Sequence, residues 1–348
     1  MDRKDIRSMT IEELKVLMGE LGEKPFRAKQ VYGWFHEKLV SSYDEMTNLP
    51  KSLREKLSAY PINPLKAVDV QVSRLDGTRK YLFRLSDGNV IESVLMRYKH
   101  GNSVCISSQV GCRMGCRFCA SAIGGLTRNL TAGEMLDQIY RIQVLTGERV
   151  SNVVVMGTGE PLDNYENLLR FIRILTEEGG LHISQRNLTV STCGIVPKIR
   201  ELAGEKLQMT LALSLHAPND EKRRELMPIA RKYTIEEILA ACEYYFKETG
   251  RRITFEYSLV AGVNDSQADA AQLADRIKSI NCHVNLIPVN PVKERSFRRS
   301  AREAVEKFKI KLEKYGINVT IRREMGGDID GACGQLRKSY MEKTESEK

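Results

Sequence analysis

The alternation of short apolar segments with capped helices is the feature that most constrains how this chain folds. From about residue 103 onward, short apolar segments indicate strands at 103–108, 152–156, 188–193, 209–214, 253–259, 283–288 and 317–322. Segments with helical spacing lie between them, near 131–146, 164–178, 196–204, 234–248, 267–280 and 299–315. Thr131 with Glu134, and Thr234 with Glu237, have the spacing of capping boxes, which mark the N-termini of helices. Repeated strand–helix units predict a parallel sheet, doubly wound or closed into a full or partial barrel, with the functional residues in the loops after the strands.

Two smaller regions precede this α/β domain. Residues 1–65 show helical patterns, with a capping-box pair at Thr10 and Glu13 and a second helix expected over about 26–40. They predict an accessory helical domain that ends near the proline-containing segment 61–64. Residues 66–98 contain three runs rich in β-formers, separated by two Asp-Gly pairs, and predict a short antiparallel meander linking this domain to the main one. The main domain is expected over 99–337, followed by a polar tail at 338–348.

Composition restricts the class of protein. A hydrophobic content of 42% supports a sizeable core. The first residues lack the apolar run of a secretory signal, and no apolar stretch approaches the length of a membrane span. We therefore expect a soluble, cytoplasmic protein with no membrane partner. Residues 293–323 contain eleven Lys/Arg against four Asp/Glu, which indicates either an anionic partner such as nucleic acid or an ordinary solvated helix face.

The cysteines carry the strongest chemical signal. Four of the eight lie within residues 105–119, and Cys112, Cys116 and Cys119 have C-x3-C-x2-C spacing directly after the first predicted strand of the main domain. Structural disulfides do not persist in the cytoplasm, so metal ligation or thiol chemistry is favoured. Three thiolates would leave one iron of a four-iron cluster without a protein ligand, free to bind a substrate or cofactor. A zinc site that recruits Cys105, or unliganded thiols, are the alternatives.

Polar residues follow several other predicted strands. Gly159 and Glu160 lie in a Gly-Thr-Gly-Glu-Pro turn, where glycines would let the backbone approach a ligand and the carboxylate could accept from an ammonium group. Ser191, the segment 214–216 and Asn290 occupy similar positions. Each alone is an ordinary turn residue, but the repeated position favours a ligand site.

The isolated cysteines divide into two kinds. Cys242 lies on an apolar helical stripe, and we expect it, Cys193 and Cys282 to be buried core thiols. Cys333 instead lies in a glycine-rich segment after the last predicted strand, where small neighbours would leave its sulfur accessible for reaction.

Taken together, these motifs make the chain resemble the RlmN/Cfr group of radical S-adenosylmethionine (SAM) RNA adenine methyltransferases. The resemblance covers nearly the whole length. It rests on the segment 105–112, the three cluster cysteines, the segments 128–131, 159–162 and 214–219, Asn264, and Cys333 in its glycine-rich segment. It implies an α/β fold, a partial (β/α)6 barrel of the TIM type, with the small helical domain and the β-meander attached.

The resemblance also implies a mechanism. A [4Fe–4S] cluster would be held by Cys112, Cys116 and Cys119, and two SAM molecules would be used per turnover. One SAM methylates Cys333; the other, bound to the cluster, is cleaved reductively to a radical that removes hydrogen from the new methyl group. The methylene radical adds to an adenine ring carbon, giving a transient protein–RNA crosslink. Glu92 would accept the proton, or Cys105 would, and attack by Cys105 would release methyladenine and leave a Cys105–Cys333 disulfide.

The remaining implications concern ligands and partners. SAM contacts would come from residues on the strand ends, namely Gly159, Glu160, Ser191, Ser214, Leu215, His216 and Asn290. The basic block at 293–323 and the N-terminal domain would hold RNA. The partners would be 23S rRNA, tRNA and an electron donor such as flavodoxin or ferredoxin, and the enzyme is expected to be a monomer.

The position of methylation is the finer question. Pro161 favours methylation at adenine C2, in the peptidyl-transferase centre of 23S rRNA and beside the anticodon of some tRNAs, because C8-specific members tend to have alanine there. The alternatives are a Cfr-type C8 methyltransferase, another radical-SAM class such as a glycyl-radical activase or thioether synthase, and a zinc-stabilised, non-catalytic RNA-binding module.

Overall fold

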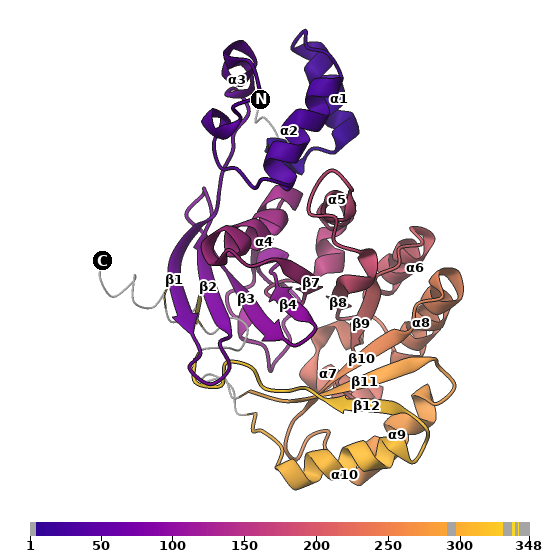
Figure 1. Cartoon of the computed structure of the whole chain (residues 1–348). Helices are drawn as coiled ribbons and strands as arrows, with labels where there is room; N and C mark the ends of the chain where they lie inside the picture. The colour runs from indigo at the N-terminus through magenta and orange to yellow at the C-terminus, as the bar shows by residue number, and fades with distance from the viewer. Residues whose placement is uncertain (1–4, 291–296, 330–335, 338–339, 341–348) are drawn as a thin grey trace.

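A single ten-stranded sheet organises the chain. The computed structural model describes residues 5–290, 297–329, 336–337 and 340. Among these residues, the strands of the large sheet follow the order β1-β2-β3-β4-β7-β8-β9-β10-β11-β12, and β5 (Gln109–Gly111) and β6 (Leu126–Asn129) form a separate hairpin. The large sheet curves from the meander at one edge to β12 at the other (Figure 1).

Seven neighbouring strands of this sheet are parallel and form the predicted partial barrel. They are β4 (Gly101–Cys105), β7 (Val150–Val155), β8 (Leu188–Thr192), β9 (Thr210–Ser214), β10 (Ile253–Leu259), β11 (Cys282–Pro288) and β12 (Asn318–Ile321). The helices between them are α4 (Ala132–Thr146), α5 (Tyr165–Thr176), α6 (Val196–Gly204), α7 (Asp220–Leu226), α8 (Ile235–Thr249), α9 (Gln267–Ile277) and α10 (Arg302–Glu313). Six strand–helix units followed by a seventh strand therefore place the loops that follow the strands together at one edge of the sheet, and the loops that follow the helices at the opposite edge.

The meander is joined directly to the barrel. β1 (Lys66–Val72), β2 (Arg79–Arg84) and β3 (Val90–Tyr98) pair antiparallel, and β3 pairs antiparallel with β4. The region expected to link the two domains is thus hydrogen-bonded into the sheet and extends one wall of the barrel.

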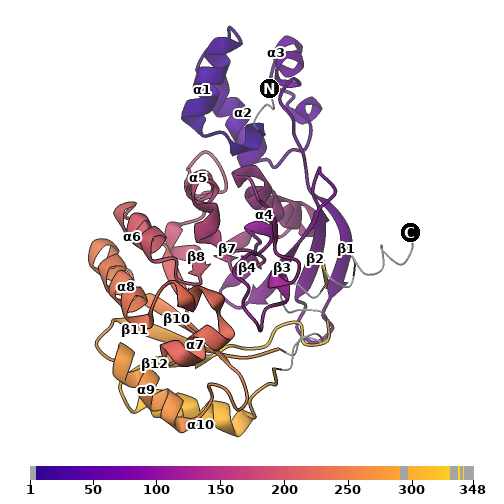
Figure 2. The same cartoon turned by 180° about the vertical axis from the view of Figure 1, so that it is seen from behind.

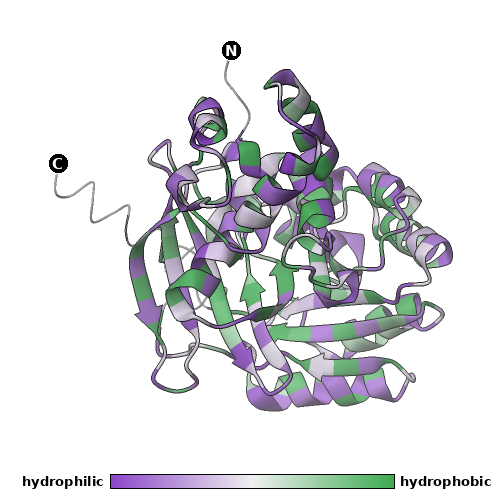
Figure 3. Ribbon diagram, turned by 45° about the horizontal axis from the view of Figure 1, so that its top comes forward, coloured by the Kyte–Doolittle hydropathy of each residue, from purple (hydrophilic) through white to green (hydrophobic). Residues whose placement is uncertain are grey.

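Amphipathic helices cover the outer face of the sheet. Figure 3 shows apolar colour along the strands and mixed colour on the surrounding helices. The two capping boxes predicted for the barrel are present, at Thr131 with Glu134 and at Thr234 with Glu237, so α4 and α8 begin where the sequence indicates. Among the described residues, no helix is both long and apolar enough to cross a membrane.

The N-terminal helices lie across one end of the barrel (Figures 1 and 2). They are α1 (Ile11–Glu20), α2 (Phe26–His36) and α3 (Lys51–Leu57), preceded by a short turn of helix at Ile6–Ser8. Thr10 and Glu13 form the predicted capping box. The predicted helix at 26–40 ends at His36, and Leu39 adopts a left-handed backbone conformation (φ 59°) that ends any helical continuation.

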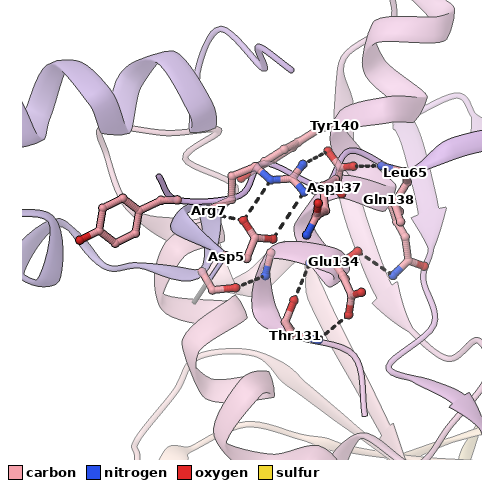
Figure 4. Close-up of polar contacts among 12 residues, drawn as sticks. Asp5, Arg7, Leu65, Thr131, Glu134, Asp137, Gln138 and Tyr140 are labelled. Carbon is pink, nitrogen blue, oxygen red and sulfur yellow. Dashed lines mark hydrogen bonds and ion pairs between the residues drawn. The ribbon is translucent and has the colours of Figure 1, made fainter. Parts of the chain in front are cut away.

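Buried charges fasten this domain to α4 (Figure 4). The Arg7 guanidinium makes an ion pair with Asp137 at 2.6 Å, and both side chains are at most 1% exposed. Asp137 also accepts from the Leu65 backbone N–H at 2.6 Å. Asp5 faces Arg7 from the other side, and its burial raises the pKa of its carboxyl above the usual value. Because each buried charge has an opposite charge beside it, the two domains dock in one fixed arrangement.

Candidate active site

One cavity of about 330 Å³ lies at the loop edge of the parallel strands. The predicted site residues that line it are Cys105, Cys112, Cys116, Cys119, Gly159, Glu160, Ser191, Ser214, His216 and Asn290. These residues span almost two hundred positions of the sequence and come from the ends of successive strands. The structure thus brings together at one cavity most of the residues that the sequence indicated.

The cysteine loop forms a wall of this cavity that is one residue thick. Cys112, Met114 and Cys116 line the cavity, as do Phe118 and Cys119. The residues between them, at 113, 115 and 117, are exposed to solvent. The loop is secured by the Cys112 backbone N–H, which donates to the Gly125 carbonyl at 2.9 Å, and by the Arg117 N–H, which donates to the Leu226 carbonyl at 2.9 Å.

The three thiols fit an iron–sulfur cluster as a donor set. Burial raises the pKa of Cys112 to about 12 and the pKa of Cys116 above its ordinary value, with the neighbouring thiols adding to both effects. Thiolates at such positions need compensating positive charge, and iron ions bound to them would supply it. The side chains of the described residues form no group of three or more His, Cys, Asp or Glu arranged to hold a metal ion. In a four-iron cluster each cysteine binds a different iron, so the three sulfurs need not meet at one ion.

Glu160 is held in place by backbone donors. Its carboxylate accepts from the Cys193 N–H at 2.7 Å and from the Leu162 N–H at 3.0 Å. The Glu160 N–H in turn donates to the Gln109 side-chain carbonyl at 2.8 Å. Burial raises the pKa of this carboxyl, and these hydrogen bonds oppose the rise. A fixed carboxylate on the cavity wall is suited to accept from a ligand ammonium group.

The two glycines of this turn are required by neighbouring backbone. A Cβ at Gly157 would lie 2.7 Å from the Ile106 carbonyl oxygen, and one at Gly159 would lie 2.8 Å from the Gln109 nitrogen. Gly159 also has φ +115°, which favours glycine. From the sequence, these glycines were predicted to let a ligand approach the backbone, and both do line the cavity. The structure adds a second reason for them: they let the turn pack against residues 106–109, just before the cysteine loop.

His216 braces the cysteine loop from the β9 side. Its ring packs edge-on against Phe118, with centroids 4.9 Å apart, and its Nδ1 accepts from the Ser258 N–H at 2.9 Å. Burial lowers the pKa of His216 to about 3, so the ring is neutral. Asn264, part of the family resemblance, donates to the carbonyls of His216 and Ser258, both at 2.7 Å. Leu215, a predicted SAM contact, is only 1% exposed and does not line the cavity, and its backbone N–H and carbonyl are bonded to Glu256 and Arg223.

A polar strip crosses the cavity floor from β8 to β11. The Ser191 and Ser214 hydroxyls are 3.4 Å apart, and Ser214 is in register with Glu256 on β10. Glu256 accepts from the Asn285 amide at 2.9 Å and lines the cavity while only 5% exposed. Burial raises the pKa of its carboxyl. Sequence reasoning missed Glu256 because it lies in the middle of a strand, not in a loop; the one signal available was a charged residue interrupting an apolar strand.

Cys193 also lies differently from its prediction. It is buried, as expected, but it lines the cavity beside Glu160. Cys242 is a core thiol as predicted, and Cys282 is likewise buried in the core. A buried arginine, Arg223, was missed as well: its guanidinium donates to the carbonyls of Cys193 and Leu215, which ties α7 to the ends of β8 and β9.

Glu92 and Cys105 occupy neighbouring positions on the wall built by β3 and β4. Cys105 lines the cavity and is in register with Val94, two residues beyond Glu92 on the same face of β3. Glu92 is 4% exposed, lies 3.2 Å from the Lys80 ammonium, and does not itself line the cavity.

Cys333 lies outside the described residues, but the segments on either side of it are anchored. On one side, Asp328 accepts from the Ser73 hydroxyl at 2.5 Å and from the Arg74 N–H at 2.8 Å. On the other side, the Arg337 N–H donates to the Glu92 carboxylate at 2.7 Å. The chain crosses from β12 to the meander (Figures 1 and 2), and both anchors lie on the meander.

The basic block at 293–323 is described in part. Arg299, Arg322 and Arg323 line the cavity, so part of the block forms the rim of the site. The lysines of α10 at 307, 309 and 311 lie on a helix whose buried residues are Val305, Phe308 and Leu312. The block therefore contributes both to the rim of the cavity and to the surface beside it.

Comparison with known proteins gives an independent view of the chain. Residues 106–274 match the radical SAM superfamily, and residues 4–61 match the ribosomal RNA large subunit methyltransferase N-terminal domain. A probable dual-specificity RNA methyltransferase RlmN from Lachnospira eligens is 67% identical over 341 residues, covering 97% of each chain. One of the same name from Lachnoclostridium phytofermentans is 63% identical, covering 98% of this chain and 96% of its own length. A solved radical SAM methyltransferase from Sphaerobacter thermophilus is 47% identical, with a TM-score of 0.91 over 95% of this chain and 98% of its own.

Proposed function

Because this chain belongs to the RlmN family of radical SAM RNA methyltransferases, we propose that it methylates C2 of one adenosine in 23S rRNA and one adenosine beside the anticodon in certain tRNAs. The observation that carries the proposal is that the three cysteines and the polar residues at the ends of the next strands line the same cavity. The relatives from Lachnospira eligens and Lachnoclostridium phytofermentans are named as probable dual-specificity RNA methyltransferases, which supports two RNA substrates.

The cavity residues have distinct roles in this proposal. Cys112, Cys116 and Cys119 would hold a [4Fe–4S] cluster, which when bound and reduced would supply the electron that cleaves SAM. Glu160 accepts from the SAM ammonium group, and the SAM molecule extends along the polar strip past Ser191 and Ser214 toward Asn290. Two SAM molecules are consumed in each turnover.

Cys333 carries the methyl carbon to the adenine. C2 of adenine is an electron-poor carbon, so transfer of an electrophilic methyl group from SAM fails there, and a carbon radical tethered to a cysteine sulfur can add instead. The described residues nearest to it on either side, Asp328 and Arg337, both bond to the meander, Arg337 to Glu92 itself. The radical adduct loses one electron to the oxidised cluster and a proton to Glu92 or Cys105. Attack of the Cys105 thiolate on the Cys333 sulfur then breaks the sulfur–carbon bond, the released carbon takes up a proton, and the reductant returns the Cys105–Cys333 disulfide to two thiols.

RNA binding in this proposal uses two surfaces. The rim arginines and α10 contact the phosphate backbone, and the N-terminal domain contacts the rest of the RNA at a distance fixed by its buried ion pairs. The target base is splayed out of the RNA into the cavity, as enzymes that modify bases require.

Identifying the methylated nucleoside tests the proposal. Cluster-loaded enzyme is incubated with SAM, a reductant and unmodified 23S rRNA, and the nucleosides are separated by mass spectrometry. We expect 2-methyladenosine in rRNA, and the same nucleoside when unmodified tRNA is the substrate. If 8-methyladenosine is the sole product, the C2 assignment is wrong and the enzyme has the Cfr-type activity.

A Cys333→Ala variant separates the methylcysteine route from other radical-SAM chemistry. We expect it to produce no methyladenosine while it still binds SAM and retains its iron. Full methylation by this variant would exclude the proposed route. The Cys242→Ala variant, at a core thiol remote from the chemistry, serves as the matched control and should retain activity.

A further inference from the structure

The outer side of the cysteine loop is basic, and the site as described does not use it. Arg113, Gly115 and Arg117 are exposed, while the residues between them line the cavity. The loop packs against α7 and the short helix η6 (Pro228–Arg231): the Arg117 N–H donates to Leu226, and a Cβ at Gly115 would touch Pro228 at 3.4 Å. These elements therefore form one continuous surface over the cysteines.

Four cations on this surface lack an acidic partner. Among the described residues, no ion pair is formed by Arg117, Arg224, Arg231 or Lys232, which together we name the loop–α7 surface. By contrast, Arg113 is paired with Asp163, and Lys222 with Asp269. With the paired Arg113 and Lys222 and the buried Arg223 set aside, segments 113–118 and 220–233 keep four Lys/Arg against three Asp/Glu, so a small positive excess remains when the acids of α7 are counted.

We propose that the loop–α7 surface is the docking site for an acidic one-electron carrier protein. The inference rests on the reductive chemistry of the proposed function, which needs one electron delivered to the cluster. The carrier loses one electron and the cluster gains it; no covalent bond forms or breaks in this step. A wall one residue thick separates the carrier from the cysteine sulfurs, and electron transfer requires such close approach without entry into the cavity.

The geometry favours a protein carrier over RNA at this surface. A target base must enter the cavity, and the arginines of the cavity lining, at 299, 322 and 323, come from the β12 and α10 side. The loop–α7 surface is on the solvent side of the loop, so a base bound there would be separated from the cavity by the loop itself. In Figure 2, α7 lies in front of the sheet while α10 lies along its lower margin. The two basic surfaces can thus serve two different anionic partners at once.

Charge reversal tests the assignment. Arg117→Glu/Arg224→Glu/Arg231→Glu enzyme, loaded with cluster under anaerobic conditions, is mixed with a purified bacterial flavodoxin in its hydroquinone state. Cluster reduction is followed by stopped-flow absorbance in the absence of RNA. We expect the second-order rate constant to fall at least tenfold relative to wild type, because complementary charge accelerates association by about 10- to 1,000-fold. Reduction by dithionite, a small reductant that needs no docking, should be unchanged.

The matched control reverses three exposed cations on α10, as Arg302→Glu/Lys307→Glu/Lys314→Glu. This variant should be reduced by flavodoxin at the wild-type rate and should bind RNA more weakly, whereas the loop–α7 variant should bind RNA within about twofold of wild type. An unchanged flavodoxin rate in the loop–α7 variant would overturn the proposal, as would a loss of RNA affinity with the flavodoxin rate retained.

Two further measurements keep the test decisive. If the triple variant fails to fold, Arg117→Gln replaces it, with an expected two- to fivefold fall in the flavodoxin rate and a weaker salt dependence than wild type; identical salt dependence would contradict the docking site. Because no RNA is present during reduction, a result of 8-methyladenosine in the product assay would overturn the C2 proposal and leave this one standing.

Discussion

Two regions of the molecule bury charged side chains, and they do so differently. At the junction with the N-terminal domain, Arg7 and Asp137 are almost wholly buried and face each other at 2.6 Å. In the cavity, Glu256 is nearly as buried, yet among the described residues it forms no ion pair: its side chain accepts from Asn285, and Arg322 acts on it from farther away. Buried charges are costly unless they are paired. The junction therefore contributes to the architecture, and the cavity retains capacity to accept hydrogen bonds from a ligand.

The largest expected effect comes from the cysteines of the cavity wall. In Cys112→Ala, the cluster loses one of its three ligands, so we expect almost complete loss of bound iron and acid-labile sulfide. Colorimetric iron and sulfide analysis after anaerobic reconstitution measures this directly. The Cys282→Ala variant, at a core thiol, should bind the wild-type amount. Normal iron content in Cys112→Ala would remove this cysteine from the proposed ligand set.

Next in size is the loss of a buried partner at the junction. Arg7→Met leaves Asp137 and Asp5 without their principal counter-charge, so we expect the free energy of unfolding to fall by about 3 kcal/mol. Urea denaturation monitored by circular dichroism provides the measurement. The exposed pair of Lys307 with Glu303 is the control, because Lys307→Met should cost no more than about 1 kcal/mol. Equal losses in the two variants would contradict the distinction drawn between buried and exposed pairs.

A smaller effect is expected where the buried carboxylate faces the ligand. Glu256→Gln preserves shape and the bond from Asn285 but removes the charge, so SAM should bind the cluster-loaded enzyme about tenfold more weakly, or about 1.4 kcal/mol. Isothermal titration under anaerobic conditions measures the affinity. Glu205→Gln, on the outer surface, should bind SAM as wild type does. A Glu256→Gln variant with wild-type SAM affinity and lowered unfolding free energy would make this residue structural.

The smallest expected effect is the pH dependence of the free energy of unfolding that His36 contributes at the junction with the N-terminal domain. Burial lowers the pKa of His36 to about 3, so the unfolded chain, with a histidine pKa near 6.5, binds a proton that the folded chain does not. The stability linked to His36 is therefore fully present above about pH 6.5 and is lost as the pH falls toward 3. Between pH 6 and 5, wild type should lose about 1.4 kcal/mol per pH unit more than His36→Gln. Urea denaturation at each pH gives the free energy of unfolding of both proteins. If this free energy falls by the same amount in wild type and in His36→Gln between pH 6 and 5, the linkage is refuted.

The periodic parts of the fold were predictable from the sequence. The predicted helix at 196–204 was confirmed residue for residue, and the barrel strands were placed to within a few positions. Capping boxes mark where α4 and α8 begin, and α6, which has no side-chain cap, begins with a proline in its first turn. The hairpin of β5 and β6 was missed, since strands of three and four residues carry too little alternation to detect. The predicted strand at 103–108 ends at Cys105, because residues 106–109 leave the sheet to bond with the Gly-Thr-Gly-Glu turn.

Site residues could be predicted where a short stretch of sequence carries the chemical signal. They could not be predicted where a residue joins the site only because distant segments pack together. Cysteine spacing and strand-end polar residues led directly to the cavity. Arg223 and Glu256 could not be identified, because a charged residue within a helix or strand is ordinary until the structure shows that it is buried. Cys193 was expected in the core because an isolated cysteine in an apolar run is most often a buried core thiol, although the strand-end signal at Ser191 already pointed to the cavity that Cys193 lines.

The central claim is that the methyl carbon reaches RNA by way of Cys333, and one measurement tests it most directly. Enzyme is first incubated with SAM bearing a ¹³C-labelled methyl group, freed of SAM, and then given unlabelled SAM, reductant and RNA for a single turnover. Mass spectrometry of the Cys333 peptide before turnover should show one added labelled methyl group, and the methyladenosine formed should carry the ¹³C label. A methyladenosine without the label, formed while the peptide keeps its labelled methyl group, would contradict the account.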